Sequence, residues 1–174
     1  VFQIDDGWEI QVGDWQADSH KFPNGMAEMA QRIVAEGLVP GIWLAPFLLM
    51  PNSAITKAHP EWLLRDKEGR AIKAAWNPNW GGDVWALDLS RSDVEDYLVY
   101  LFDTIVNVWG YRYLKLDFLY AGLMQGVFSG RKGGVWQNYA RIMARILEFS
   151  QASNGEPVAF LSCGAPIEST APFM

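Results

Sequence analysis

Short apolar runs alternate along the chain with longer segments of mixed polarity. Five runs are rich in apolar and β-branched residues: 1–5, 40–46, 84–89, 112–118 and 157–163. Successive runs begin about 28 to 45 residues apart, which is the spacing of strands joined by crossover helices. The pattern therefore predicts five strands of a parallel sheet.

Between the runs, apolar residues recur at the spacing of an amphipathic helix. These positions predict helices within residues 26–34, 92–105 and 139–147. The second helix begins with Ser92-Asp-Val-Glu95, a capping-box pattern in which both side chains bond the first backbone N–H groups. Residues 50–83 are rich in Pro, Gly and Asn, so we expect a long loop with at most short helical pieces.

Two α/β architectures share this alternation, an open doubly wound sheet and a (β/α)8 barrel. Polar residues follow the C-terminal ends of four predicted strands: Asp5, Asp6, Asp88, Asp117, Cys163 and Gly164. Barrel active sites are built on that side, and the first strand leads into Asp-Asp-Gly-Trp rather than a dinucleotide-binding glycine turn. We predict an α/β fold, a (β/α)8 TIM barrel with only about the first five βα units present, because a whole barrel needs about 200 residues or more.

Composition narrows the class of partner. Half of the 174 residues are apolar and the net charge is −6, which indicates a sizeable core and disfavours nucleic-acid and anionic-membrane partners. A neutral substrate fits better, and some of the nine tryptophans could pack against sugars as well as in the core. With a single cysteine, no signal-peptide pattern and no 20-residue apolar span, we expect a soluble protein and favour a cytoplasmic location.

The run at 112–118 ends in Lys115 and Asp117, whose side chains leave the same face of a strand. A cation and a carboxylate beside an apolar run are costly to bury unless they are paired or used. The pair is compatible with a catalytic carboxylate or with a structural ion pair. A Schiff base on Lys115 is disfavoured, because Asp117 would raise the pKa of the lysine.

Asp5 and Asp6 place adjacent carboxylates after the first predicted strand. Ionised carboxylates accept hydrogen bonds, so the two could hold two hydroxyl groups of one sugar ring, or they could organise the following turn. A metal site with Asp14, Asp18 and His20 is disfavoured, because their spacing matches neither a calcium loop nor a two-histidine site. We expect no metal and no cofactor.

Trp43 ends the second predicted strand. A tryptophan is too large for most layers inside an eight-stranded barrel, so near the C-terminal end it would line a pocket or pack in the core. The two histidines, His20 and His59, stand in no arrangement with Ser or Cys that is typical of a nucleophilic triad.

Eight short motifs follow one another along nearly the whole chain: Phe2-Gln-Ile-Asp-Asp-Gly-Trp8, Gly13-Asp-Trp15, Lys21-Phe-Pro23, Gly41-Ile-Trp-Leu-Ala-Pro-Phe47, His59-Pro-Glu-Trp62, Ala86-Leu-Asp-Leu-Ser90, Gly110-Tyr-Arg-Tyr-Leu-Lys-Leu-Asp-Phe118 and Cys163-Gly-Ala-Pro166. The ordered series resembles the catalytic barrel of family 36 glycoside hydrolases, the α-galactosidase (melibiase) family of clan D. Each motif alone is weak, but the series is specific.

The resemblance implies a retaining glycosidase that releases terminal α-linked galactose from oligosaccharides through a covalent galactosyl-enzyme. Asp117 matches the nucleophile, and Lys115 matches the lysine that binds galactose hydroxyls beside it. Asp5 and Asp6 match the pair that binds the hydroxyls distinguishing galactose. The other matched pocket residues are Trp43, Cys163 and Gly164. A positive charge on Lys115 would help keep Asp117 ionised and nucleophilic.

In the family, the acid/base aspartate lies on the sixth strand and a β-domain precedes the barrel. The resemblance therefore implies that residues 1–174 are a partial catalytic barrel, strands 1 to 5, without the N-terminal β-domain and strands 6 to 8. Its open edges would invite self-association or complementation. Two alternatives stay open: galactosyl transfer of the raffinose-synthase type on the same barrel, and a catalytically incompetent fragment that acts only as a sugar-binding or structural unit.

Overall fold

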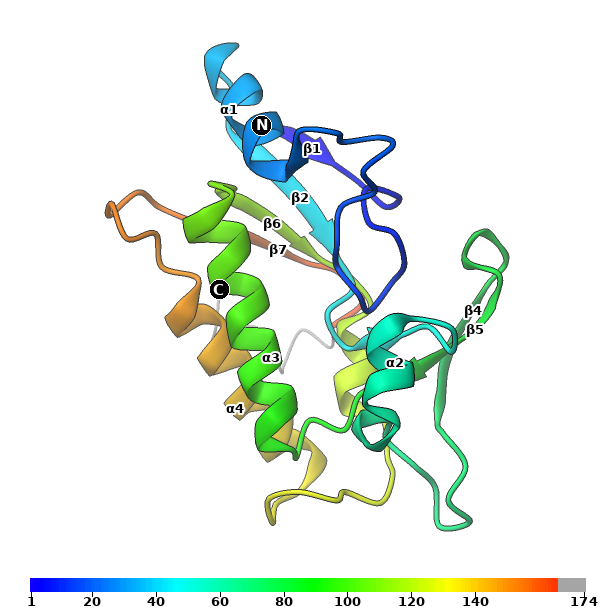
Figure 1. The fold of residues 1–174 in the computed structure, drawn as a ribbon. Helices are drawn as coiled ribbons and strands as arrows, with labels where there is room; N and C mark the ends of the chain where they lie inside the picture. The colour runs from blue at the N-terminus through cyan, green and yellow to red at the C-terminus, as the bar shows by residue number, and fades with distance from the viewer. Residues whose placement is uncertain (166–174) are drawn as a thin grey trace.

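The computed structural model describes residues 1–165. Its main sheet is parallel and has the strand order β1-β2-β6-β7. The strands are β1 (Phe2–Ile4), β2 (Pro40–Leu44), β6 (Tyr113–Leu116) and β7 (Ala159–Ser162). Leu116 lies opposite Leu44 on one side and Ser162 on the other, so neighbouring strands end at the same edge. Figure 1 shows the four strands side by side, as in the wall of a barrel.

Helices connect these strands, as the apolar spacing predicted. They are α1 (Gly25–Ala35), α3 (Ser92–Asp103) and α4 (Val135–Phe149), and α3 continues into a π-helical turn, Thr104–Val108. Figure 1 shows α3 and α4 packed against each other. Their buried side chains, among them Phe102 and Ile142, belong to one core with the strand residues. This core fixes the strands that carry the site.

The prediction that residues 84–89 form a strand of the parallel sheet is wrong. A second, antiparallel sheet has the order β3-β5-β4 and comprises β3 (Leu48–Leu49), β4 (Lys73–Asn77) and β5 (Gly82–Ala86). Gly81 and Gly82 adopt φ of 87° and 133°, which lets the chain reverse between β4 and β5. The main sheet therefore has four strands within residues 1–165, and β2 pairs directly with β6.

The segment 50–83 is more structured than a long loop. Besides β4 it contains a short helix, α2 (Ala54–Ala58), and two 3-10 turns, η1 (Pro60–Trp62) and η2 (Pro78–Trp80). The β4–β5 hairpin lies beyond the C-terminal ends of the parallel strands (Figure 1). This excursion can therefore place side chains over the edge where the predicted site lies.

Ser92 does not cap α3, so the capping-box prediction is also wrong. Ser92 is the first helical residue, and Arg91 occupies the N-cap position without a side-chain cap bond. Within the first turn, Asp93 Oδ1 accepts from the backbone N–H of Val94 at 3.0 Å. The carboxylate of Glu95, which is 7% exposed, pairs instead with three guanidinium groups: those of Arg131, Arg141 and Arg145. Burial opposes ionisation of Glu95, but the hydrogen bonds and charges of Arg131 and Arg141 outweigh it and lower the pKa of this carboxyl. The carboxylate thus ties α3 to α4 and the segment before it.

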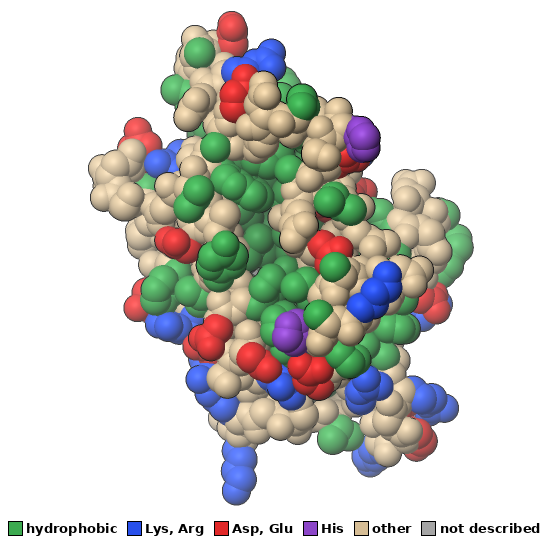
Figure 2. Space-filling view, viewed as in Figure 1, with side chains coloured by type: hydrophobic (Ala, Val, Ile, Leu, Met, Phe, Trp, Pro, Cys, Tyr) green, Lys and Arg blue, Asp and Glu red, His purple; other side chains and the backbone are tan. Residues whose placement is uncertain are grey.

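Charges of both signs are interspersed on the face shown in Figure 2, where hydrophobic side chains gather across the middle. Within residues 1–165, no helix has the length and apolarity needed to cross a bilayer.

Candidate active site

The edge where β1, β2, β6 and β7 end brings together the predicted site residues. Two backbone hydrogen bonds extend the pairing past the strand ends, from Asp117 N to Leu44 O and from Cys163 N to Leu116 O, each 2.7 Å long. They place Asp117 between the ends of β2 and β7. The four strand ends therefore form one continuous floor.

Lys115 pairs with Asp5 across this floor. Its Nζ lies 2.9 Å from Asp5 Oδ2, and Gln3 Nε2 donates to the same oxygen at 2.5 Å. The backbone N–H of Asp6 donates to Asp5 Oδ1 at 2.9 Å. Burial alone would raise the pKa of Asp5, but the bonds from Lys115 and Asp6 outweigh it and lower the pKa. Asp5 is therefore an ionised acceptor fixed by three donors.

The same pair decides the state of Lys115. Its hydrogen bond to Asp5 raises the pKa of the ammonium group, and the charges of Asp5 and Asp117 add to that effect. Lys115 therefore stays protonated, which supports the argument against a Schiff base. The expected rise in the pKa of Lys115 is confirmed, but its main cause is the hydrogen bond to Asp5 and not the charge of Asp117.

Asp117 is half-buried and is held by two N–H donors. Trp43 Nε1 donates to Oδ2 at 3.2 Å, and the backbone N–H of Phe118 donates to Oδ1 at 2.8 Å. Phe118 adopts φ of 54°, an uncommon left-handed conformation for a bulky residue and one that often marks functional sites. Among the described residues, the ion pair of Lys115 is with Asp5, so the hypothesis of a structural Lys115–Asp117 ion pair is wrong.

Trp43 combines the two roles that the sequence left open. The side chain is 2% exposed, and its ring packs edge-on to Trp15 with centroids 5.9 Å apart. Its Nε1 nevertheless reaches Asp117, and its ring also lies 5.9 Å from that of Trp80. Trp43 is therefore a core residue whose polar end belongs to the site.

Trp80 is a site residue that the sequence reasoning missed. It lies in η2, and its Nε1 donates to Asp6 Oδ2 at 2.8 Å. Its ring is 5.3 Å from that of Phe118, so it covers the floor between Asp6 and Asp117. The available signal was a tryptophan among the Pro, Asn and Gly residues of a long segment, a composition that indicates a loop but not where it folds.

Cys163 and Gly164 form the turn after β7. The carbonyl of Cys163 accepts from Leu119 N at 3.3 Å, and that of Gly164 accepts from Tyr120 N at 2.9 Å. Gly164 has φ of 63°, which favours glycine. Burial and the charge of Asp117 raise the pKa of the Cys163 thiol, so it lies beside the site as a neutral group.

Asp88 does not belong to this edge, because it follows β5 of the second sheet. It is 1% exposed and accepts hydrogen bonds of 2.6–3.0 Å from the backbone N–H and hydroxyl groups of Ser90 and Ser129. Asp88 therefore orders the segment after β6, and its expected place at the barrel edge is corrected.

Asp14 and His59 have structural contacts. Asp14 accepts from the backbone N–H groups of Ala54 and Ile55 at 2.9 Å each, and so caps α2. His59 stacks on Trp62 with ring centroids 4.2 Å apart. Within residues 1–165, no group of three or more His, Cys, Asp or Glu side chains is placed to hold a metal ion.

Comparison with known proteins identifies the family. Residues 1–147 match the Melibiase family model. The chain belongs to this family. It is 32% identical over 121 residues to "Alpha-galactosidase 2" of Pediococcus pentosaceus, a match that covers 66% of the chain and 16% of that relative. The chain thus spans about a sixth of this relative's length.

Solved structures agree with the family. TtGalA, an α-galactosidase from Thermus thermophilus in complex with stachyose, superposes with a TM-score of 0.82 at 40% identity, over 97% of this chain and 34% of that one. GH36 α-galactosidase AgaA A355E D548N from Geobacillus stearothermophilus, in complex with raffinose, gives 0.70 at 25% identity, over 92% and 23%. The resemblance to family 36 glycoside hydrolases and the partial α/β-barrel fold are confirmed.

Proposed function

We propose that this melibiase-family chain carries the nucleophile part of a retaining α-galactosidase site. The observation that supports it most is Asp117, a half-buried carboxylate held by Trp43 and Phe118 next to the Lys115–Asp5 pair. Such a carboxylate has a defined orientation and an adjacent group of hydroxyl-binding side chains. Two similar structures are complexes with stachyose and raffinose, which supports α-galactoside oligosaccharides as the substrate class.

In this proposal, an oxygen of Asp117 forms a bond to the anomeric carbon of galactose while the glycosidic bond breaks. The leaving oxygen takes a proton from a second carboxyl. That carboxylate afterwards accepts a proton from water, whose oxygen bonds to the anomeric carbon while the bond from Asp117 to that carbon breaks. A retaining site needs the two carboxyls about 5 Å apart. We expect the second carboxyl to come from residues of the protein other than the four described strand ends, as the resemblance to the family implies.

Asp5, Asp6 and Lys115 would bind the galactose hydroxyl groups. Their charges lie at the floor of the site, where the ammonium group donates and the carboxylates accept. Trp80 offers an aromatic face beside them. These sugar-binding side chains would serve hydrolysis and galactosyl transfer equally, because both reactions bind the same galactose. Transfer of the galactosyl group to a sugar hydroxyl would use the same intermediate, and product analysis separates it from hydrolysis.

The experiment that tests the function replaces Asp117 by Ala in the whole protein that contains this chain. Turnover of an aryl α-galactoside should fall by several orders of magnitude, with azide restoring part of the rate and giving the β-galactosyl azide. Asp96→Ala, on the exposed side of α3, is the matched control for loss of one carboxylate. Near-normal turnover of the Asp117 variant would exclude its nucleophilic role.

We further propose that the outer edges of β1 and β7 are completed by additional strands. Phe2 is 52% exposed and Leu161 is 41% exposed, although each lies in a strand of the main sheet. Unpaired strand edges invite association. The chain of residues 1–174 alone should therefore self-associate. It should also hydrolyse α-galactosides at less than about a thousandth of the rate of a complete enzyme, because in this proposal other residues of the protein supply the general acid. Size-exclusion chromatography and a chromogenic assay test both points, and an active monomer would contradict them.

A further inference from the structure

Glu9 is a buried carboxyl group that the catalytic proposal does not use. It is 6% exposed and lies in the segment after β1, where a bridge to Ala17 holds its backbone. Its Oε2 accepts a hydrogen bond from the backbone N–H of Gly7 at 3.3 Å. The side chain therefore turns back against the same turn that carries Asp6.

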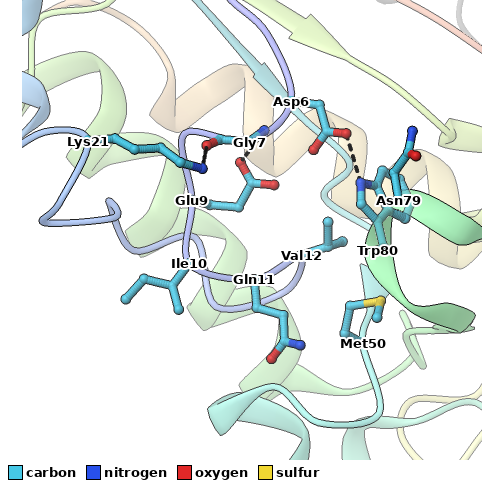
Figure 3. A pocket seen from close by; sticks show the side chains of 10 residues that line it. All are labelled: Asp6, Gly7, Glu9, Ile10, Gln11, Val12, Lys21, Met50, Asn79 and Trp80. Atoms are coloured by element: carbon cyan, nitrogen blue, oxygen red, sulfur yellow. Dashed lines mark hydrogen bonds between the residues drawn. The ribbon is translucent and has the colours of Figure 1, made fainter.

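The carboxyl groups of Glu9 and Asp6 lie together at a cavity of about 370 Å³ (Figure 3). Lys21 is the other charged residue that lines this cavity. Its Nζ donates to Gly7 O at 2.6 Å and lies 3.7 Å from Asp18 Oδ2. Burial, and then the hydrogen bond and negative charge of Asp6, raise the pKa of Glu9 from 4.5 to about 7. In weak acid Glu9 is thus a neutral donor beside an acceptor.

We propose that Glu9 is a positioning residue whose protonated carboxyl holds the Asp6 carboxylate in the orientation that binds a sugar hydroxyl. This inference rests on the proposed function. Trp80 already donates to Asp6 Oδ2, so a second donor on the other side would fix the carboxylate at two points. Once Glu9 loses its proton, two negative carboxylates face each other and Asp6 turns away. Galactoside affinity then falls as the pH rises through about 7, whereas the chemical step at Asp117 is not directly involved.

The test measures KM and kcat for an aryl α-galactoside, and the inhibition constant of galactose, from about pH 5.5 to about pH 8.5. The whole protein is compared with its Glu9→Gln and Glu9→Ala variants. In the parent, KM and the inhibition constant should rise about five-fold across this range, the size expected for one hydrogen bond to a partly exposed carboxylate. The Glu9→Gln variant donates at every pH, so both constants should stay flat, and Glu9→Ala should be weak throughout. Glu36→Gln, an exposed carboxyl just beyond α1, should keep the parent profile.

Two results separate the inference from the function on which it rests. If Glu9→Gln keeps the pH profile of the active parent, the positioning role is wrong while the galactosidase function stands. If the parent neither binds nor cleaves galactosides, the proposed function fails. The ¹³C titration of the Glu9 carboxyl then tests whether Glu9 and Asp6 interact. Its midpoint should move to lower pH in the Asp6→Asn variant, because the negative neighbour is gone. An unchanged titration in that variant overturns the inference.

Discussion

Replacing Glu9 by Gln should change how the stability of the chain depends on pH. Burial and Asp6 raise the pKa of Glu9 from 4.5 to about 7. Between these values the folded chain keeps the proton that the unfolded chain has lost, so the free energy of unfolding falls as the pH rises. At 1.36 kcal/mol per pH unit, the free energy of unfolding falls by about 3 kcal/mol between these two pKa values. Glutamine has no proton to lose, so the variant lacks this decrease.

Urea unfolding of the parent chain and of Glu9→Gln from about pH 4.5 to about pH 8 measures the effect. Carboxylates whose pKa is lowered, such as Asp5 and Glu95, contribute equally to both proteins and cancel in the difference. That difference should grow by about 3 kcal/mol in favour of the variant as the pH rises. Glu36→Gln controls for the loss of one surface charge. A difference that is constant within about 0.5 kcal/mol would show that Glu9 does not titrate between pH 4.5 and about 7 in the folded protein.

Two further predictions concern substrate recognition. Asp5→Asn and Asp6→Asn should each weaken galactose binding about ten-fold or more, with a smaller effect on the unfolding temperature. The amide keeps one acceptor oxygen, but it replaces the other by an NH2 donor and removes the negative charge that the hydroxyl groups bond. Binding as tight as in the parent would assign the two residues to the turn alone. Trp80→Phe keeps an aromatic ring but removes the N–H donor to Asp6 at 2.8 Å, so KM should rise about five-fold at constant kcat. A matching fall in kcat would indicate that Trp80 acts on the chemical step instead.

Local sequence was sufficient for the elements that build the main sheet and for much of the site. The apolar runs that became β2 and β6 are buried by neighbours on both sides, and the helices follow the apolar period of their own residues. Asp5, Lys115 and Asp117 could be placed at one edge because a side chain at the end of a parallel strand lies at that edge whatever the connections do.

Pairings between distant segments could not be read in this way. The run at 84–89 has the composition of a strand, but only the reversal at Gly81 and Gly82 directs β5 to the antiparallel sheet. Likewise, the capping pattern at Ser92 is a local signal. In the folded chain the Glu95 carboxylate pairs with three arginines of a later segment instead of bonding the start of its own helix. The alternation of apolar and polar residues in a strand specifies which face is buried but not which strand pairs with it. The pairing therefore depends on how the whole core packs.

The contacts of the site show the same division. The spacing of Lys115 and Asp117 already assigns both side chains to one face of a strand, but Lys115 pairs with Asp5, which is 110 residues away. Trp80 reaches Asp6 over 74 residues, through the second sheet. These partners follow from the folded arrangement, because hydrogen bonds and close charge pairs act over a few ångströms. They therefore depend on which strand ends and loops the packed core brings together.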